Sequence, residues 1–379
     1  MVTASKRART ALVLSGGGAR GAYQVGVLRG LFEQGFLGRE RSGIDVFVGS
    51  SAGSINSAAL AAHADDFEAG ITRLERVWRG MHPSHVYRTD AASLGRIGLR
   101  WAWDLSFGGA TRDVQPKALL DTSPLRALLT QHLPLSRIGE HVAAGRLDAL
   151  AIVATDLHTS SGVIFLDGSA DLPSWTRRRW RIERTAIAVD HLLASSAIPI
   201  FFPSVAIDGR HYGDGSIRNT APLSPAINLG AQRIIAIGVS GPPPPSLAPG
   251  PVEVPTVAQI AGVLLDAVML DAIEVDVEHS ERVNASVVTY PVIGTGDGFR
   301  RIDVLWLRPS VLVRELASEL ADRIPPAVRY LLRGLGSEAQ ITELASYLLF
   351  DEAFCGRLLD LGREDVAADR DRIARFFAP

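Results

Sequence analysis

The stretch that most constrains this chain is Gly49–Gly53, which reads Gly-Ser-Ser-Ala-Gly and follows a short apolar run. The pattern G-x-S-x-G predicts that Ser51 occupies a sharp turn between a strand and a helix, because glycine on both sides lets the backbone fold tightly. The residues that follow are small, which is typical of a helix packed closely on its strand. The positive N-terminal end of such a helix favours a developing oxyanion or alkoxide. Ser51 is therefore a candidate nucleophile.

A second glycine-rich stretch precedes it and also follows an apolar run, Ala11–Leu14. Its members are Gly16, Gly17, Gly18, Ala19, Arg20 and Gly21. Backbone N–H groups in such a run have little side-chain cover, and at the start of a helix they form a site for negative charge. A serine turn combined with an anion site indicates acyl transfer through a tetrahedral intermediate.

The same glycines allow one alternative interpretation. Gly16, Gly18 and Gly21 fit G-x-G-x-x-G, the dinucleotide-binding fingerprint. That site needs an acidic residue at the end of the second strand, about 20 residues further on. Asp45 instead precedes the second predicted strand, and this strand ends in the serine turn, which a dinucleotide does not need. Dinucleotide binding is therefore the less favoured interpretation.

Composition narrows the class of protein. The chain has 379 residues, and its formal net charge of −2 provides no overall positive field for nucleic acid. Cys355 is the only cysteine, which excludes an internal disulfide and a cysteine-rich zinc site. No uncharged stretch reaches the roughly 18 residues of a membrane span, and the first apolar run is too short for a signal peptide. We expect a soluble, cytoplasmic protein, and a peripheral position at a membrane is compatible with these features.

Short apolar runs alternate with helical periodicity, which predicts a mainly parallel sheet covered by helices. Strands are predicted at 11–14, 46–48, 149–154, 162–166, 234–239 and 301–307, with a hairpin that turns at Asp208-Gly209. Helices are predicted after the glycine loop as far as Gly35, then at 52–62, 66–80, 123–129, 186–197 and 256–283, and the remainder, 311–379, is helical.

Three segments carry weaker signals. The tryptophans between 94 and 105 favour a helix that contributes to the core, with a lid over an apolar cleft as the alternative. Prolines between 242 and 255 mark an extended loop. The basic run Arg177–Arg181 favours a solvated, partly ion-paired surface over a site for anionic lipid head groups.

A serine hydroxyl becomes a good nucleophile only when a base takes its proton. Asp214 is the favoured partner, because it lies between two glycines where a carboxylate can enter a site without crowding. Asp167, which is also followed by glycine, has no comparable surroundings and is less favoured. A triad with a histidine stays open, with His211 and His279 as the available residues.

These motifs, taken in order, resemble the patatin-like phospholipases. Gly16–Gly21 resembles the glycine-rich oxyanion loop of that family, and Gly49–Gly53 resembles its nucleophile turn. Ala194–Pro199 resembles the segment that precedes the acid-bearing hairpin, and Asp214-Gly215-Ser216 resembles the D-G-G or D-G-A motif. Ser216 departs from the small residue usual at the third position, which leaves the geometry of that turn as a question. The likeness is close over residues 10–225 and looser to about 310.

The resemblance implies a three-layer α/β/α fold with a mainly parallel central sheet, here as a hydrolase domain over 10–310 with a helical C-terminal segment, 311–379, packed on it. It implies a Ser51–Asp214 dyad without a catalytic histidine. It also implies oxyanion binding by backbone N–H groups of Gly16, Gly17, Gly18 and Ala19, supported by Arg20, and no metal or cofactor.

The expected activity is hydrolysis of carboxylic esters of lipids, as in a phospholipase A, a lysophospholipase or an esterase, through an acyl-enzyme on Ser51. The expected partners are a lipid or lysolipid substrate and a transient membrane surface, and the sequence leaves the oligomeric state open. Two alternatives remain: an acyltransferase that uses the same acyl-enzyme, and a lipid-binding regulatory protein with a vestigial site.

Overall fold

The computed structural model describes most of the chain: residues 8–39, 42–88, 118–173, 175, 179–242, 260, 267, 272–289, 300–326, 328–329 and 344–378. Three sequence-based expectations lie wholly or largely outside these residues. They are the core helix or lid at 94–105, the proline-rich loop, and the first half of the helix predicted at 256–283.

A nine-stranded sheet forms the centre of the fold. The strands are β1 (Thr10–Leu14), β2 (Val46–Ser50), β3 (Ala149–Asp156), β4 (Ser161–Gly168), β5 (Trp180–Arg184), β6 (Val205–Ile207), β7 (Arg210–Asp214), β8 (Arg233–Ile237) and β9 (Asp303–Leu307). Seven of them follow the order β5-β4-β3-β2-β1-β8-β9, and the β6–β7 hairpin attaches to β3. Pairing is parallel except between β3 and β4, between β3 and β7, and within the hairpin.

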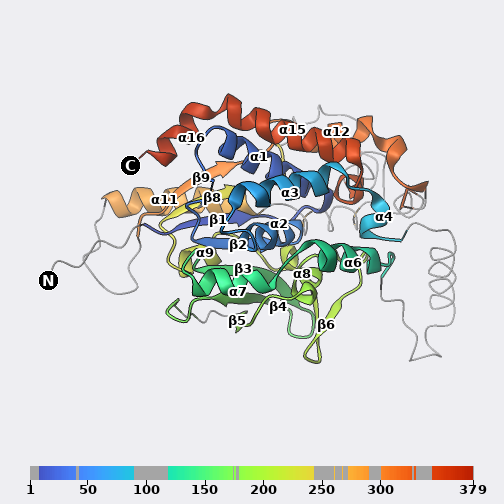
Figure 1. The fold of residues 1–379 in the computed structure, drawn as a ribbon, viewed down its shortest axis with the longest axis horizontal. Coiled ribbons are helices and arrows are strands. Elements are labelled where there is room, and N and C mark those ends of the chain that lie inside the picture. The colour runs from blue at the N-terminus through green and yellow to red at the C-terminus, as the bar shows by residue number, and fades with distance from the viewer. Residues whose placement is uncertain are drawn as a thin grey trace.

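Helices cover both faces of this sheet (Figure 1). They include α1 (Ala22–Glu33), α2 (Ala52–Ala61), α3 (Phe67–Arg79), α4 (Pro83–Val86), α6 (Ser123–His132), α7 (Ser136–Ala143), α8 (Val189–Ser195), α9 (Ser224–Asn228), α11 (Ile273–Thr289), α12 (Val313–Glu319), α15 (Glu352–Ala368) and α16 (Arg370–Phe377). Short 3₁₀ turns follow β1 at Gly18–Gly21 and β7 at Gly215–Ile217.

The alternation of side chains along each strand divides the core into two clusters. Leu12 and Leu14 of β1 join the larger cluster with α1, α2, α3, α6, α8 and α15, whereas Ala11 and Val13 join the smaller one with α9 and α11. Successive side chains of a strand point to opposite faces, so a strand buried on both faces is apolar throughout. The three-layer α/β/α arrangement with a mostly parallel sheet is confirmed.

Most predicted elements are present, with differences at two places. The helix predicted to end at residue 283 continues to Thr289, because no glycine or proline interrupts the chain before Pro291. Trp180 and Arg181 lie in an edge strand, β5, which the charge of that segment concealed. Arg181 forms ion pairs with Asp156 and Glu183, as expected for a partly ion-paired surface.

The described part of 311–379 is helical, and α15 lies directly on α1 (Figure 1). Glycines permit this contact. A Cβ atom on Gly26 of α1 would lie 2.1 Å from the carbonyl oxygen of Leu359, and one on Gly362 of α15 would lie 2.5 Å from that of Tyr23. The two helix backbones therefore touch with no side chain between them. The domain boundary at residue 310 stays a prediction.

This contact predicts the effect of a single methyl group. Gly26→Ala should destabilise the protein by about 1 to 3 kcal/mol, because the added Cβ must push α15 away from α1. Gly139→Ala is the matched control: it lies in helix α7 with open space at its Cβ position, so the better helix propensity of alanine should leave stability unchanged or slightly raised. Thermal and denaturant unfolding measure both. Equal stability of Gly26→Ala and the unaltered protein would mean that the two helices do not pack this closely.

Candidate active site

Ser51 sits on a strained turn between β2 and α2. Its backbone angles are φ 51° and ψ −129°, a conformation that residues other than glycine rarely adopt. The flanking glycines are required by space, since a Cβ atom on Gly49 would lie 2.4 Å from the carbonyl oxygen of Gly53. The turn is therefore the tight one that the sequence pattern predicts.

Ser195, at the end of α8, holds this turn in place. The Ser51 N–H donates to the Ser195 carbonyl oxygen at 3.2 Å and to its hydroxyl oxygen at 3.0 Å. The Ser195 hydroxyl in turn donates to the carbonyl oxygen of Val153 in β3, at 2.6 Å. Two residues further on, the Ala197 carbonyl oxygen accepts from the N–H of Asp214 at 3.1 Å. The sequence drew attention to this segment, but it gave no indication that the segment binds both predicted catalytic residues.

Strand β3 brings Asp214 to Ser51. The first part of β3 pairs with β2, up to Ser50 opposite Val153. The next residues of the same edge pair with β7, and Ala154 lies opposite Asp214. The ends of β2 and β7 thus meet on one edge of one strand. Gly215 completes the contact, because a Cβ atom there would lie 2.3 Å from the Val153 carbonyl oxygen and 3.1 Å from the Ser50 Cβ.

The carboxyl group of Asp214 is fully buried. One oxygen, Oδ1, accepts a hydrogen bond from the backbone N–H of Ser216 at 2.8 Å. The other, Oδ2, has no donor of good geometry among the described residues, although the Ser51 hydroxyl is near enough to lower the pKa of the acid. Burial has the larger effect and raises the pKa of Asp214 to about 6, while the Ser216 N–H and the two hydroxyls oppose it. Ser216 therefore fits the turn and contributes a donor to the acid.

The glycine loop lies against the same two residues. A Cβ atom on Gly16 would lie 3.0 Å from the Ser51 Cβ and 2.4 Å from the Ser216 hydroxyl oxygen. Gly18 has φ 54° and opens the 3₁₀ turn that leads into α1. Gly17 and Ala19 flank it in the same buried loop. The loop thus lies beside the serine, and its backbone N–H groups are candidates for an anion site.

Arg20, the fifth residue proposed for oxyanion binding, directs its guanidinium group elsewhere. The side chain is 2% exposed and donates to the Ser346 hydroxyl at 2.8 Å and to the Tyr347 hydroxyl at 3.2 Å. Its guanidinium carbon lies 4.0 Å from the centre of the Tyr347 ring, a cation–π contact. Arg20 therefore binds a segment more than 300 residues away in the chain.

That segment, residues 344–350, forms part of the wall of the site. A Cβ atom on Gly18 would lie 2.1 Å from the Tyr347 carbonyl oxygen, so the loop and the segment touch through their backbones. The Tyr87 hydroxyl donates to the Leu348 carbonyl oxygen at 2.8 Å. Phe350 stacks on Trp78, with ring centres 6.4 Å apart. No sequence pattern connects these residues with the serine motif, so sequence analysis missed them.

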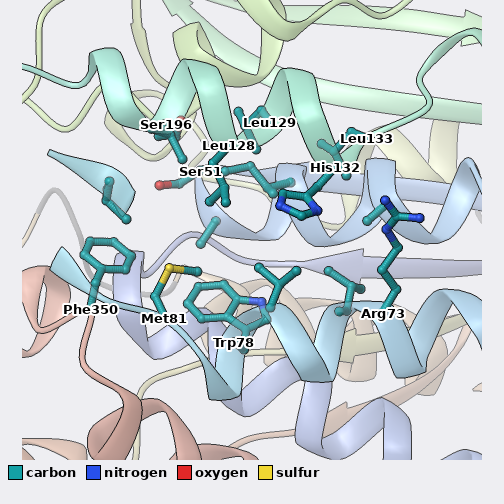
Figure 2. A pocket seen from close by; sticks show the side chains of 18 of the residues that line it. Ser51, Arg73, Trp78, Met81, Leu128, Leu129, His132, Leu133, Ser196 and Phe350 are labelled. Atoms are coloured by element: carbon teal, nitrogen blue, oxygen red, sulfur yellow. The ribbon is translucent and has the colours of Figure 1, made fainter. Parts of the chain in front are cut away.

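An apolar cavity extends from Ser51 (Figure 2). It encloses about 820 Å³, the solvent at its mouth included. Helices α2, α3 and α6 form its length, and Ser51, Ser196 and Phe350 lie toward one end, with Arg73 and His132 toward the other. Its lining is almost wholly hydrophobic near the serine. The cavity can hold a hydrocarbon chain whose carbonyl group lies at Ser51.

The other candidate acids and bases lie away from Ser51. Asp167 is opposite Leu150 on β3, four residues from the position opposite Asp214, or about 13 Å along the strand. His211 hydrogen-bonds the Ser204 hydroxyl at 3.1 Å, and His279 is exposed on α11. Among the residues with a described position, no group of three or more His, Cys, Asp or Glu side chains could hold a metal ion. No helix within the described ranges is long and apolar enough to span a membrane.

The architecture and the order of its motifs place this chain in the three-layer α/β/α class with a serine turn and a glycine-rich loop at the edge of the sheet. A model of the patatin-like phospholipase family matches residues 12–227, more than half of the chain. The chain belongs to this family.

Two curated relatives match by sequence. The patatin-like phospholipase domain-containing protein ZK370.4 of Caenorhabditis elegans is 29% identical over 228 residues, which are 60% of this chain and 13% of that protein. The uncharacterized protein YjjU of Escherichia coli is 25% identical over 232 residues, 60% of this chain and 51% of that protein. The chain thus spans about half or less of the length of these relatives.

Solved structures also match. Human GIVD cytosolic phospholipase A2 covers 98% of this chain and 60% of its own, with 12% identity and a TM-score of 0.47. The match to VipD of Legionella pneumophila covers 94% of this chain and 67% of VipD, with 12% identity and a TM-score of 0.35.

The buried acid predicts a stability effect opposite to that of an ordinary carboxylate. The pKa of Asp214 is about 6 when folded and 3.8 ordinarily, so ionisation at neutral pH costs the native state about 3 kcal/mol. The native state is therefore more stable below pH 4, where the acid is protonated in both the folded and the unfolded chain, than at neutral pH. This gain in stability is lost as the pH rises through 6. Asp214→Asn removes the ionisation, so it should raise the free energy of unfolding at pH 8 and have little effect at pH 4.

Asp156→Asn is the control of opposite sign. Burial favours the neutral acid there too, but hydrogen bonds from the Thr159 and His158 backbone and from Arg210 prevail and lower the pKa of Asp156 to about 2. Its replacement should therefore destabilise the protein at pH 8. Denaturant unfolding at both pH values measures each variant. An Asp214→Asn protein that is less stable than the unaltered one at pH 8 would contradict the burial of a charge at this position.

Proposed function

We propose that the protein is a serine lipid acyl hydrolase that cleaves carboxylic esters of phospholipids, lysophospholipids or other acylglycerols. The observation that carries this proposal is the position of Ser51, which lies at the end of an apolar cavity and beside the buried carboxyl group of Asp214. Membership of the patatin-like phospholipase family supports a lipid as the substrate.

The first half of the reaction forms an acyl-enzyme. Ser51 Oγ attacks the ester carbonyl carbon while its proton moves to Asp214, whose Oδ2 has no competing donor of good geometry among the described residues. The carbonyl oxygen gains the negative charge, and backbone N–H groups of Gly17, Gly18 and Ala19 stabilise it. Collapse of this intermediate breaks the ester bond, and the alcohol leaves with the proton from Asp214.

The second half repeats these steps with water. Asp214 takes a proton from a water molecule, which attacks the acyl carbon, and the bond to Ser51 Oγ breaks as the serine regains its proton. The product is a fatty acid. The raised pKa of Asp214 suits this role, because a carboxylate with a pKa near 6 is a stronger base than an ordinary one and is still ionised at pH 7.

Hydrolysis of a short-chain nitrophenyl ester tests the assignment of both residues. With chelator present, the unaltered protein should release nitrophenol, and Ser51→Ala and Asp214→Asn should each lose at least about 10³-fold in kcat/KM. Unaltered activity in Ser51→Ala would overturn the proposal. Loss in Ser51→Ala alone would instead require another base, with His211 as the first residue to replace. Product analysis with added glycerol separates hydrolysis from transfer to an alcohol.

The dependence of rate on pH tests the base separately. The reaction needs ionised Asp214, so kcat/KM should fall about tenfold for each pH unit below 6 and be level above it. Ser216→Ala retains the backbone donor but loses the hydroxyl that also lowers this pKa, so its midpoint should move upward. A profile that is level down to pH 4.5, or a midpoint that Ser216→Ala moves downward, would exclude Asp214 as the titrating base.

A further inference from the structure

Three helices each contribute a row of side chains to the wall of the cavity at Ser51, and we call these rows stripes. On α2 and just beyond it the lining residues are Ala52, Ile55, Ala59 and His63, one for each turn of helix. Helix α3 runs back along it and contributes Trp78, Leu74 and Arg73, and α6 contributes Leu125, Leu129 and His132. Each stripe begins with apolar residues near the serine. Each one also carries a histidine or an arginine farther from the serine: His63, Arg73 or His132.

These three polar residues lie together at the end of the cavity remote from Ser51. Figure 2 shows His132 and Arg73 on the side of the cavity away from Ser51, with Leu133 near His132. His63, Arg73 and His132 also line a second, open cavity, which is more polar than the first and contains Asp66, Glu68 and Arg76. At these three residues the apolar cavity therefore opens into the second, hydrated cavity. We call His63, Arg73 and His132 the polar ring.

Arg73 gives the ring a positive charge that no described residue pairs with. Arg73 is exposed and forms no ion pair or hydrogen bond with the residues whose positions are described. His63 uses Nδ1 in a hydrogen bond with the Ala59 carbonyl oxygen at 2.8 Å, so its other nitrogen is left for water or for a ligand. Methylene groups placed against such side chains displace water from them and lose the free-energy gain of apolar burial.

The length of the stripes sets a scale. Ser51 and His63 are twelve residues apart, or roughly 18 Å along a helix, and Met81 and Arg73 are eight apart, or roughly 12 Å. An extended hydrocarbon chain advances about 1.25 Å per carbon–carbon bond, from bond lengths near 1.5 Å and tetrahedral angles. A chain of roughly 10 to 14 carbons therefore reaches from Ser51 to the polar ring.

We infer that the cavity is an acyl-binding tunnel of limited length, in which the polar ring limits the buried part of a fatty acyl chain to about 10 to 14 carbons. This inference rests on the proposed function, because Ser51 marks the carbonyl end of the chain. Each methylene within the tunnel is buried among leucines, alanines and aromatic rings. Each one beyond the ring enters the polar outer cavity and adds nothing to binding.

A series of saturated nitrophenyl esters from C4 to C16, each below its aggregation concentration, measures this length. The unaltered protein should gain up to about fourfold in kcat/KM for each added methylene until 10 to 14 carbons, and then level off or fall. A steady rise to C16, or no dependence on length, would overturn the inference. If acyl length has no effect but a series of esters with alkyl alcohols of increasing length shows a break, the tunnel binds the alcohol portion of the ester instead.

Variants of the ring test the cause of the limit. Arg73→Leu and His132→Leu continue the apolar stripes outward, so each should raise the C16-to-C8 ratio of kcat/KM about three- to tenfold. Arg76→Leu is the matched control, because it lies on the same helix and lines only the outer cavity. Ala59→Leu should narrow the tunnel two thirds of the way along and move the break to about seven to nine carbons. A break that none of these substitutions moves would mean that the ring does not set it.

Binding separates this inference from the proposed function. Calorimetry with Ser51→Ala and fatty acids of 6 to 16 carbons should show affinity that rises and then levels off at the same length. If esters are not hydrolysed through Ser51 but fatty acids show this break, the tunnel stands and the proposed function fails. If esters are hydrolysed through Ser51 and neither series shows a break, the proposed function stands and the tunnel fails.

Discussion

The site depends on one edge of β3, which two strands share. Strand β2 occupies the first part of this edge and runs parallel to β3, and β7 occupies the rest and runs antiparallel. Because β2 and β7 follow each other along this edge, the ladder of hydrogen bonds is continuous. The C-terminal ends of the two strands are therefore forced together. Those ends carry Ser51 and Asp214. Their approach is therefore fixed by backbone pairing, and it does not depend on long, mobile side chains.

Both residues are held in states that are unfavourable by themselves. Ser51 has a backbone conformation that L-residues avoid, and Asp214 is a carboxyl group buried without a cation beside it among the described residues. Such states persist only where surrounding structure determines them, and here the strands beneath and Ser195 beside them do so. The same two conditions suit the proposed reaction, because the turn places Ser51 in the wall of the apolar cavity and burial makes Asp214 a stronger base.

Local sequence predicted the architecture well, since the motifs depend on steric rules that act over a few residues. Gly49 and Gly16 lie where any side chain would collide with backbone or with Ser216, so glycine at these positions reports the geometry directly. Strand β5 was not predicted, because an edge strand needs neither two apolar faces nor freedom from charge. The contact of Arg20 with Ser346 could not be predicted at all. It joins residues that are 326 positions apart, which tertiary packing such as that of α15 on α1 brings together.

Residues 344–350 also have a consequence for the order in which the protein becomes active during synthesis. Phe350 and the Tyr347 backbone reach the ribosome exit roughly 300 residues after Ser51, or about 15 to 60 s later at ordinary rates of elongation. Until then the glycine loop has no wall behind Gly18, and the buried Arg20 has no hydroxyl partner in that segment. A nascent chain can thus fold its sheet early while the glycine loop beside Ser51 still lacks this support. Under the proposed function, translation itself would then delay activity until residues 344–350 have been made.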